Sequence, residues 1–545
     1  MRVALVYAPL LPGHVPSYGL QPLGILNIAA VLNRAGITTS VLDADIQGLS
    51  IAETADRLLA SAPDLVGISL MTPQLLSALA LCAALKHRQP QLPIVLGGAH
   101  IDATHGDVFS MTTMADFAIH GEGELALLEC CQRLEKDGTR PAGSIGYSNL
   151  RSLLADVPNV ILPDRQASDG VARVNPARPY IANLDDLPPV DYGLLGDHPY
   201  QLPMLPGPRV LSMMLSRGCP FSCTFCDAPQ VMGKKLRRYS ITRIVEEIRQ
   251  NRDRFGTRSF VFKDSTFSAS IRWATELCQA MLDAQLGIRF RCNTRADLLP
   301  PPLLSLMRRA GCEAINIGVE SGDPEILRRI RKEVDLASVV DAFERCRREG
   351  VRTYATLLVG APGETDASIT RTRDFALRLR PSLVNFHIAI AYPGTPLYDE
   401  AVALGQVEPR WWARQVRKGF DPRRATPFEA RWGWVADGAL RLPSFAAESW
   451  QRRLTRSWYL RPAFVWDSAV FSLRQPYFLR HLFSLGRELL PIAKLRTLLP
   501  GYTAPPDERL QILERCPSAP TVVYAPRSVA QRRSLRVVRV PEVTR

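Results

Sequence analysis

The feature that most constrains the fold is the alternation of short apolar runs with stretches of helical length. In the first 130 residues the apolar runs are "VALVYAP", "TTSVLDAD", "LVGISL" and "PIVLGG", and helical patterns separate them near residues 23–35, 51–60 and 75–86. Strands that are apolar throughout and separated by helices indicate a parallel sheet covered on both faces. We therefore predict an α/β doubly wound, Rossmann-like domain over residues 1–140, with ligands bound beyond the carboxyl ends of its strands.

A second series of the same kind begins near residue 206. Its runs are "VLSMMLS", "SFVFKDS", "IRFRCNT", "AINIGVE", "TYATLLVG" and "LVNFHIAIAYP", with charged amphipathic stretches between them. Six such units predict a partial (β/α)6 barrel of the TIM type over residues 206–400, with functional residues in the loops after the strands. Residues 141–205, rich in Pro, Gly, Asp and Asn, are predicted to be a linker with short strands.

Composition narrows the class of protein and its compartment. A chain of 545 residues with 46% hydrophobic and 22% charged residues is typical of a soluble globular protein with several domains. Its apolar stretches fall short of the roughly 18 to 20 residues that a membrane helix needs, and the N-terminus lacks the pattern of a secretion signal. The eleven cysteines are mostly scattered, which favours a reducing compartment. We therefore expect a cytoplasmic protein.

Residues 401–545 form a helical, basic C-terminal region in this interpretation. "ESWQRRLTRSWYLRPAF" and "QPYFLRHLFSLGRELL" are typical of amphipathic helices. We expect their apolar sides to pack against other domains, with peripheral contact to a membrane surface or a lipophilic substrate as the alternative. Residues 518–545 carry six Arg and one acidic residue, which predicts a solvated, disordered basic tail and contributes to the net charge of +14.

Three cysteines are grouped in "SRGCPFSCTFCDAP", directly after the first predicted barrel strand. They are Cys219, Cys223 and Cys226. A disulfide would leave one cysteine over, and structural zinc normally requires four compactly spaced ligands. Three thiolates are the number that would hold a four-iron cluster with one iron left open. The spacing therefore favours an iron–sulfur site at the barrel mouth, where barrel enzymes work.

This segment resembles the signature of radical S-adenosylmethionine (SAM) enzymes, including the aromatic Phe225 before the third cysteine. The resemblance implies a 4Fe-4S cluster on the three cysteines and SAM as a second cofactor. In that family the open iron binds the amino and carboxylate groups of SAM, and an electron from the cluster cleaves SAM to methionine and a 5'-deoxyadenosyl radical. An electron donor such as flavodoxin or ferredoxin is implied as a partner.

Further motifs follow in the order that this family shows. "GVESG" places Glu320 where a polar side chain contacts SAM, and "LVGAPGET" places Gly360 and Gly363 where backbone approaches the adenine. In "NTRAD", Arg295 lies where it would pair with the methionyl carboxylate, a geometry that suits guanidinium. "KDSTF" puts Asp264 at the mouth after the second strand. Each motif is weak alone, and their order makes the resemblance specific.

The combination with the first domain resembles the radical SAM enzymes that carry a cobalamin-binding domain, over about residues 1–400. Their loop motif Asp-x-His-x-x-Gly supplies an imidazole to cobalt. Here "DADIQG" retains Asp43 and Gly48 and has Asp45 where the histidine would be. We therefore predict that the lower face of cobalt is not ligated by histidine, with Asp45 acting through water instead.

Two other turns of this domain match the positions that surround the nucleotide tail of cobalamin. "SLMT" offers Ser69 and Thr72, and "GGAH" offers Gly97 and Gly98 for close approach of backbone. A cobalamin-like domain that binds nothing is the alternative. His100 and His120 lie nearby, and neither is assigned a role.

The resemblance implies transfer of a methyl group to an unactivated carbon of a small-molecule or lipid-like substrate. Radical ring formation or oxygenation without methyl transfer, as in the anaerobic porphyrin-ring cyclase, uses the same two sites and is the first alternative. RNA modification is a lower-ranked alternative, because neither a second cysteine set nor a C-terminal RNA-binding barrel is visible, and nucleic acid is therefore not the expected partner. A binding-only role with cobalamin as a sensor ligand would not need the three cysteines.

Overall fold

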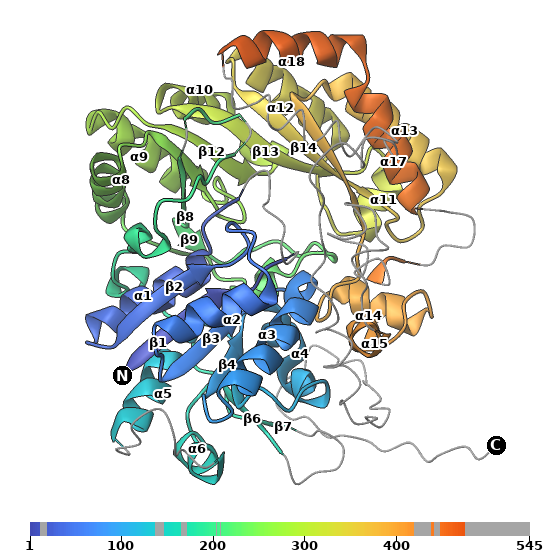
Figure 1. Ribbon diagram of the computed structural model, residues 1–545. Helices are drawn as coiled ribbons and strands as arrows, with labels where there is room; N and C mark the ends of the chain where they lie inside the picture. The colour runs from blue at the N-terminus through green and yellow to red at the C-terminus, as the bar shows by residue number, and fades with distance from the viewer. Residues whose placement is uncertain are drawn as a thin grey trace, which may run out of the picture.

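The computed structural model describes residues 1–10, 19–136, 147–164, 172–202, 204–207, 209–418, 438–440 and 447–474. Two sheets dominate it, one mainly and one wholly parallel (Figure 1). The N-terminal sheet, drawn mostly in blue, lies below the barrel sheet, drawn in green to yellow. The predicted α/β architecture with two strand series is confirmed.

The first sheet has seven strands in the order β2-β1-β3-β4-β5-β6-β7. Its strands are β1 (Arg2–Tyr7), β2 (Thr38–Asp43), β3 (Leu65–Ser69), β4 (Ile94–Gly97), β5 (Phe117–Ile119), β6 (Val160–Pro163) and β7 (Ala172–Val174). The pairs from β2 to β5 are parallel, and β6 and β7 add antiparallel pairs at one edge. These last two strands lie in the segment predicted to be a linker with short strands.

Helices cover both faces of this sheet, as predicted for a doubly wound domain. They are α1 (Leu23–Arg34), α2 (Ile51–Ala60), α3 (Leu75–Arg88), α4 (Ala99–Thr104), α5 (Gly123–Lys136) and α6 (Tyr147–Leu153), with the 3-10 helices η1 (Thr72–Gln74) and η2 (His105–Ser110). Val3 and Leu5 of β1 pack in one cluster with residues of α1 and α5, whereas Ala4 and Val6 pack with α2 and α3. Burial on both faces explains why these strands read as continuous apolar runs.

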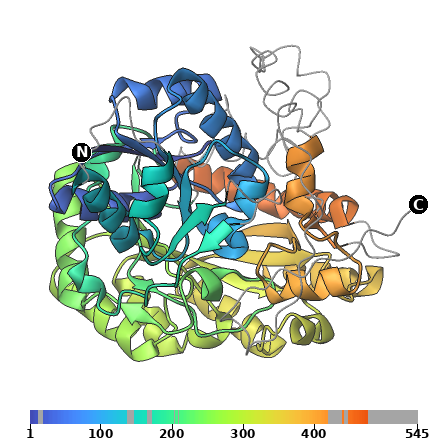
Figure 2. The ribbon, with the colours of Figure 1, turned by 90° about the horizontal axis from the view of Figure 1, so that it is seen from below.

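The second sheet is a six-stranded partial barrel whose parallel strands follow sequence order. Its strands are β8 (Val210–Met213), β11 (Ser259–Phe262), β12 (Arg289–Thr294), β13 (Cys312–Glu320), β14 (Arg352–Val359) and β15 (Leu383–Ile388). Its helices are α8 (Ile241–Phe255), α9 (Ile271–Asp283), α10 (Pro301–Arg309), α11 (Pro324–Arg329), α12 (Leu336–Arg348) and α13 (Asp366–Leu379), with the 3-10 helices η3 (Leu184–Asp186), η4 (Tyr192–Leu195) and η5 (Ala296–Leu298) nearby. Seen from below, these helices form an arc outside the strands (Figure 2).

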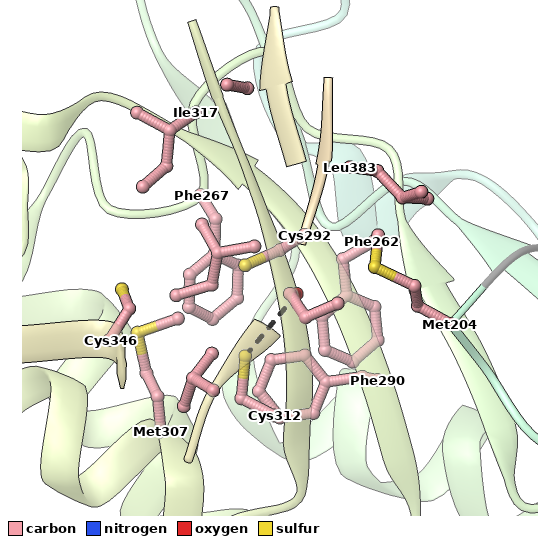
Figure 3. Close-up of a cluster of buried hydrophobic side chains, with 14 of the residues drawn as sticks. Met204, Phe262, Phe267, Phe290, Cys292, Met307, Cys312, Ile317, Cys346 and Leu383 are labelled. Carbon is pink, nitrogen blue, oxygen red and sulfur yellow. Dashed lines mark hydrogen bonds between the residues drawn. The ribbon is translucent and has the colours of Figure 1, made fainter. Parts of the chain in front are cut away.

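The main core of the barrel lies between its strands and this arc of helices (Figure 3). Phe262 of β11 stacks on Phe290 of β12 with ring centroids 4.8 Å apart. Cys292 and Ile317 on neighbouring strands, and Cys346 of α12, are fully buried in the same cluster. Cys292 and Cys346 are therefore packing residues.

The part of the chain after the barrel returns to both sheets. Its described helices are α14 (Pro396–Ala403), α15 (Trp411–Lys418), α17 (Ala447–Tyr459) and α18 (Pro462–Arg474). Trp412 of α15 donates its indole N–H to Asp107 of the first domain at 2.7 Å. Leu454 and Trp458 of α17 are buried in the barrel core, so this amphipathic helix packs as expected. "QPYFLRHLFSLGRELL" and the predicted disordered tail lie outside the described residues.

Within the described ranges, no helix combines the length and the hydropathy required to cross a bilayer.

Candidate active site

The three grouped cysteines lie in a loop that a short hairpin closes. The hairpin strands are antiparallel, and one helical turn lies within the loop: β9 (Ser216–Arg217), β10 (Arg237–Arg238) and α7 (Ala228–Val231). Cys219 donates its backbone N–H to the carbonyl of Gly233 at 3.0 Å. Gly218 has φ 101°, and a Cβ there would lie 2.3 Å from the carbonyl oxygen of Lys235. Only glycine fits this approach, which presents the loop at the carboxyl end of the barrel.

The three thiols influence one another electrostatically. The pKa of Cys226 is raised to about 12, mainly by burial, and Cys219 and Cys223 contribute to this rise. Burial also raises the pKa of Cys223, which nearby Lys332 lowers. Among the residues that the structure describes, no three His, Cys, Asp or Glu side chains are arranged as a ready-made metal site. The loop thus brings the thiols near one another without setting them as metal ligands.

Glu320, at the end of β13, forms an ion pair with Lys332 close to Cys223 of the cysteine loop. Its carboxylate lies 3.3 Å from the ammonium of Lys332, and both side chains are more than nine-tenths buried. A Cβ on Gly318 would lie 2.4 Å from the Glu320 carboxylate and 2.8 Å from the Lys332 ammonium, so the glycine makes room for the pair. Burial raises the pKa of Glu320, while Lys332 and Arg295 oppose the shift.

Arg295 lies beside this pair and is held by three contacts. It makes a forked ion pair with Asp297, with two distances of 3.0 Å, and donates to the carbonyl of Glu333 at 2.5 Å. Its guanidinium also lies 4.1 Å from the ring centroid of Phe221, a residue of the cysteine loop. Arg295 is therefore in the site, but its guanidinium already pairs with a carboxylate of this chain.

The glycine stretch after β14 encloses a buried carboxylate. Glu364 accepts the backbone N–H groups of Gly360 at 2.5 Å and Ala361 at 3.1 Å. Its other oxygen is buried and has no hydrogen-bond partner among the described residues. Burial raises the pKa of Glu364 to about 7. Gly360 and Gly363 have φ 86° and 75°, so both positions need the freedom of glycine.

Two further predicted residues connect the loop to its surroundings. Phe225 is half-buried between the core of the first domain and a small cluster that contains Ala361. Asp264 is buried, accepts the hydroxyl of Ser216 at 2.5 Å, and has its pKa raised to about 6 by burial. Asp264 thus holds the start of the cysteine loop through Ser216.

In the first domain, the predicted acidic turn follows β2. Asp43 is buried, accepts the backbone N–H of Ile46 at 3.2 Å and the hydroxyl of Tyr200 at 2.9 Å, and has its pKa raised to about 6 by burial. Asp45 accepts the backbone N–H of Leu10 at 2.8 Å. Gly48 closes the turn with φ 62°.

The two other predicted turns meet beside this one at the ends of β3 and β4. Thr72 shares a hydrogen bond of 3.0 Å with Nδ1 of His100. His100 is fully buried, which lowers its pKa to about 3, and its Nε2 has no partner among the described residues. Gly98 has φ 103°, and a Cβ there would lie 2.6 Å from the carbonyl of Leu70 and 3.2 Å from the hydroxyl of Ser69.

Gly97, the last residue of β4, is less constrained. A Cβ at this position would meet its nearest neighbour, the carbonyl of Ile119, at an ordinary 3.7 Å. The close approach of backbone that the sequence predicts at the glycine pair is therefore a property of the second glycine.

The two candidate sites face each other. Helix α4, which begins after Gly98, contacts α7, which follows the last cysteine. Next to this contact, Arg217 of β9 lies between Glu122 at 2.8 Å and Glu124 at 2.6 Å, and Arg237 of β10 also pairs with Glu122 at 2.8 Å. These buried ion pairs fasten the base of the cysteine loop to the first domain.

The donor types fit the cofactors that the sequence predicts. Three neighbouring thiols suit iron, and the orphaned oxygen of Glu364 lies next to the glycines proposed for the adenine. In the first domain, the crowded glycine turn at Gly98 and the buried, unpartnered nitrogen of His100 lie where the cobalamin tail is expected. A doubly wound domain stacked on a partial barrel with this loop defines the class of radical SAM enzymes with an added ligand-binding domain.

Comparisons with known proteins specify the family. Residues 213–376 match the model of the Radical SAM superfamily, and residues 13–130 match the B12 binding domain. An uncharacterised methyltransferase of Pyrococcus horikoshii is 27% identical over 81% of this chain and 88% of its own length. The anaerobic magnesium-protoporphyrin IX monomethyl ester cyclase of Rubrivivax gelatinosus is also 27% identical, over 73% of this chain and 70% of its own length.

A solved structure has the same fold. The radical SAM methyltransferase TsrM of Kitasatospora setae, with cobalamin and a [4Fe-4S] cluster bound, superposes with a TM-score of 0.59 and 17% identity, over 80% of this chain and 88% of that one. The chain belongs to the cobalamin-binding radical SAM enzymes, whose cofactors are a 4Fe-4S cluster, SAM and cobalamin.

Sequence reasoning missed several residues of the site. Lys332 pairs with a predicted position but comes from a loop without a recognisable pattern. Glu364 lies within the quoted segment "LVGAPGET", where only its glycines were assigned a role. Phe221 was within the quoted cysteine segment, and its place between two cysteines was the available signal. The acidic residues that hold Arg217 lie more than 90 positions away from it, so no local pattern could reveal them.

Proposed function

We propose that this enzyme transfers a methyl group to an unactivated carbon of a small-molecule substrate. The observation that supports this most is the contact between α4 and α7, because it sets the turns proposed for cobalamin against the cysteine loop. A substrate between the two would meet both reactive groups. The methyltransferase names of two of the relatives agree with this assignment.

Each set of residues has a defined task in this proposal. Cys219, Cys223 and Cys226 hold the cluster, and Arg295 and Glu320 orient SAM beside it. When bound, the cluster and SAM would supply one-electron radical chemistry, and the cobalamin would supply methyl transfer.

The adenine-side and cobalamin-side residues act by shape and hydrogen bonding. Gly360 and Gly363 admit the adenine, with Glu364 as an acceptor for its amino group while ionised and Phe225 as an apolar wall. In the first domain the turns that begin at Asp43, Ser69 and Gly97 would enclose the cobalamin tail, with Gly48, Thr72 and Gly98 as the remaining positions of these turns. Asp45 would face the lower side of cobalt through water.

The enzyme would require a reducing partner, for which flavodoxin or ferredoxin is proposed, and would work in the cytoplasm. The first alternative remains radical ring formation or oxygenation without methyl transfer, because the cyclase relative aligns with 73% of this chain. A peripheral membrane contact through α18 is a further proposal, since Trp466 of that helix is 71% exposed.

The decisive experiment follows the methyl group. The protein is reconstituted anaerobically with iron, sulfide and cobalamin, and ultraviolet–visible spectra establish that both sets of absorption bands are present. It is then incubated with methyl-labelled SAM, a reductant and a fraction of cellular small molecules. Label in a product together with 5'-deoxyadenosine supports methyl transfer. Sustained formation of 5'-deoxyadenosine and of an unlabelled product would instead establish the alternative. A Cys223→Ala variant controls for cluster-independent labelling.

A further inference from the structure

The strands of the barrel carry a second set of side chains on the side away from the helices. Successive residues of a strand point to opposite sides of a sheet. Phe262, Phe290 and Ile317 pack against the helices, so the residues that alternate with them face the interior of the barrel. We call the part of this set beyond the first residue of each strand the inner face, and its polar members on the last five strands are Lys263, Arg291, Asn293, Asn316, Tyr354, Thr356, Asn385 and His387.

The strand register places these side chains next to one another. Asn316 lies beside Asn293 on one neighbouring strand and beside Tyr354 on the other, and Thr356 lies beside Asn385. The amide of Asn316 donates to the side-chain oxygen of Asn293 at 3.2 Å. The inner face is therefore a continuous polar surface across five strands.

This surface ends at the proposed SAM site. Arg295 comes two residues after Asn293 on the same side of β12, and the carboxylate of Glu320 lies over Gly318 of β13. At the opposite end, α18 lies across the amino ends of the strands, where Phe471 packs 3.4 Å below the guanidinium of Arg352 (Figure 1). A molecule on the inner face would therefore have one end at the proposed radical source.

Two cations are neighbours on the inner face. Arg291 is 8% exposed and lies 4.9 Å from the ring centroid of Tyr354. Lys263 is its neighbour, and burial together with Arg291 lowers the pKa of the Lys263 ammonium to about 8. No ion-pair or hydrogen-bond partner of that ammonium is found among the described residues. A partly buried ammonium beside a second cation is unfavourable, and an anion placed against both would relieve the repulsion.

The remaining inner-face groups are neutral and polar. His387 is accessible, yet it is surrounded by enough protein that its pKa is lowered to about 4 and the ring is neutral at pH 7. The side-chain oxygen of Asn316 has no hydrogen-bond partner among the described residues. The acidic side chain next to Lys263 in sequence, Asp264, bonds Ser216 on the other side of the strand. The inner face thus carries neutral hydrogen-bonding groups together with the two cations.

We propose that the inner face binds an anionic group of the substrate, of the phosphate, phosphonate or carboxylate type, through Lys263 and Arg291. The inference rests on the proposed function, because it names the class of substrate for the same site. The anionic group would anchor the molecule at the level of these two cations, and its reacting carbon would lie toward Arg295 and Glu320. A wholly apolar lipid does not match this surface.

The test measures binding of small probes without turnover. The reconstituted full-length protein is saturated with SAM, without reductant. The SAM carboxylate then occupies the proposed site at Arg295, so that the probes can bind only elsewhere. Methylphosphonate and its neutral dimethyl ester, and acetate and acetamide, are then titrated at constant ionic strength by isothermal calorimetry. We expect binding of an anion and about tenfold weaker binding, or none, of its neutral counterpart.

Variants locate the probe. Lys263→Gln and Arg291→Gln are expected to weaken anion binding about tenfold, whereas Lys263→Arg keeps it. Arg289→Gln, which removes an exposed charge from the same strand, should leave binding as in the parent protein. Equal binding of charged and neutral probes, or equal weakening by Arg289→Gln, would overturn the proposal. If Lys263→Gln does not fold, as judged by circular dichroism, the comparison of probes on the parent protein decides alone. Selective anion binding in these titrations, combined with no label transfer in the experiment with methyl-labelled SAM, would refute the proposed function and leave the anion site standing.

Discussion

The parallel strands of the first sheet and those of the barrel sheet are both covered by helices, but they differ in how their polar and apolar residues are arranged. In β1 four consecutive residues, Val3 to Val6, are buried, because helices lie on both faces. In β14 buried positions alternate with half-buried ones from Arg352 to Leu357, because only one face meets helices. A sheet with two buried faces confines its polar groups to the strand ends. A barrel also carries them along the length of its strands.

This difference assigns different work to the two regions. In the first domain the expected place for a ligand is over the turns that follow β2, β3 and β4. This arrangement suits a cofactor that stays bound through many turnovers. The barrel has both a strand-end site, with the cysteine loop, and an inner face that can differ among relatives without disturbing the core. Four predictions test whether the two regions differ in this way.

Replacing all three cysteines with alanine should separate the two regions completely. We expect iron content to fall to background and SAM cleavage to fall by roughly a thousandfold or more, because the thiolates are the iron ligands in our proposal. Cobalamin binding should persist, because its turns belong to the other sheet. Iron analysis, deoxyadenosine formation and the cobalamin spectrum measure these outcomes. Simultaneous loss of cobalamin would contradict the division, and Cys346→Ala, a core thiol, serves as the control.

Arg217→Met should weaken the connection between the regions. The substitution leaves Glu122 and Glu124 buried without their shared guanidinium, which we expect to destabilise the fold by about 3–5 kcal/mol. Urea unfolding measures it, and a single transition that splits into two would indicate that the regions had come apart. The exposed pair of Arg272 and Glu276 provides the control, because Arg272→Gln should change stability by less than about 0.5 kcal/mol.

Adjacent positions on one strand should respond differently in the two sheets. In β14, Leu357→Ala is expected to cost about 2–5 kcal/mol and Thr356→Ala less than about 1 kcal/mol, because only the leucine faces the helices. In β1, Leu5→Ala and Val6→Ala should each cost about 2 kcal/mol or more, since each faces a helical layer. Chemical denaturation of the four variants tests this. Similar costs at both β14 positions would refute the assignment of an inner face.

The smallest effect concerns the buried carboxyl of Asp43. Its pKa is raised to about 6 in the folded protein, from an ordinary value of 3.8, so the folded state binds the proton more tightly than the unfolded chain. Stability associated with this group is present below pH 4 and is lost as the pH rises toward 6, by up to about 3 kcal/mol. Asp43→Asn should therefore show a flatter dependence of unfolding free energy between pH 4 and 6. A dependence equal to that of the parent protein would contradict the shift.

The alternation of strands with helices and the position of the cysteine loop after the first barrel strand were both predictable from the sequence, because periodicity and motif spacing are local properties. The partners of the predicted residues were not, because they depend on contacts between distant segments. Lys332 reaches Glu320 across a turn, and Arg217 meets Glu122 from another domain. The inner face had a local signal, since "RFRCNT" and "TYATLL" alternate polar with apolar residues. Our prediction from these runs was a partial barrel without an assigned inner face, and it is this alternation that distinguishes a barrel strand from a strand buried on both faces.

The partial barrel has two edge strands, and each is blocked by a side chain that behaves like a neighbouring strand. Gln21 donates to the carbonyl of Val210 at 2.7 Å and accepts the N–H of Ser212 at 2.9 Å on β8. On β15, the hydroxyl of Tyr459 donates to the carbonyl of Val384 at 2.5 Å and accepts its N–H at 3.4 Å. Unpaired edges recruit strands from other molecules and promote aggregation. The loss of one amide or one phenol would therefore change the solubility of the protein and its tendency to self-associate before it changed the chemistry.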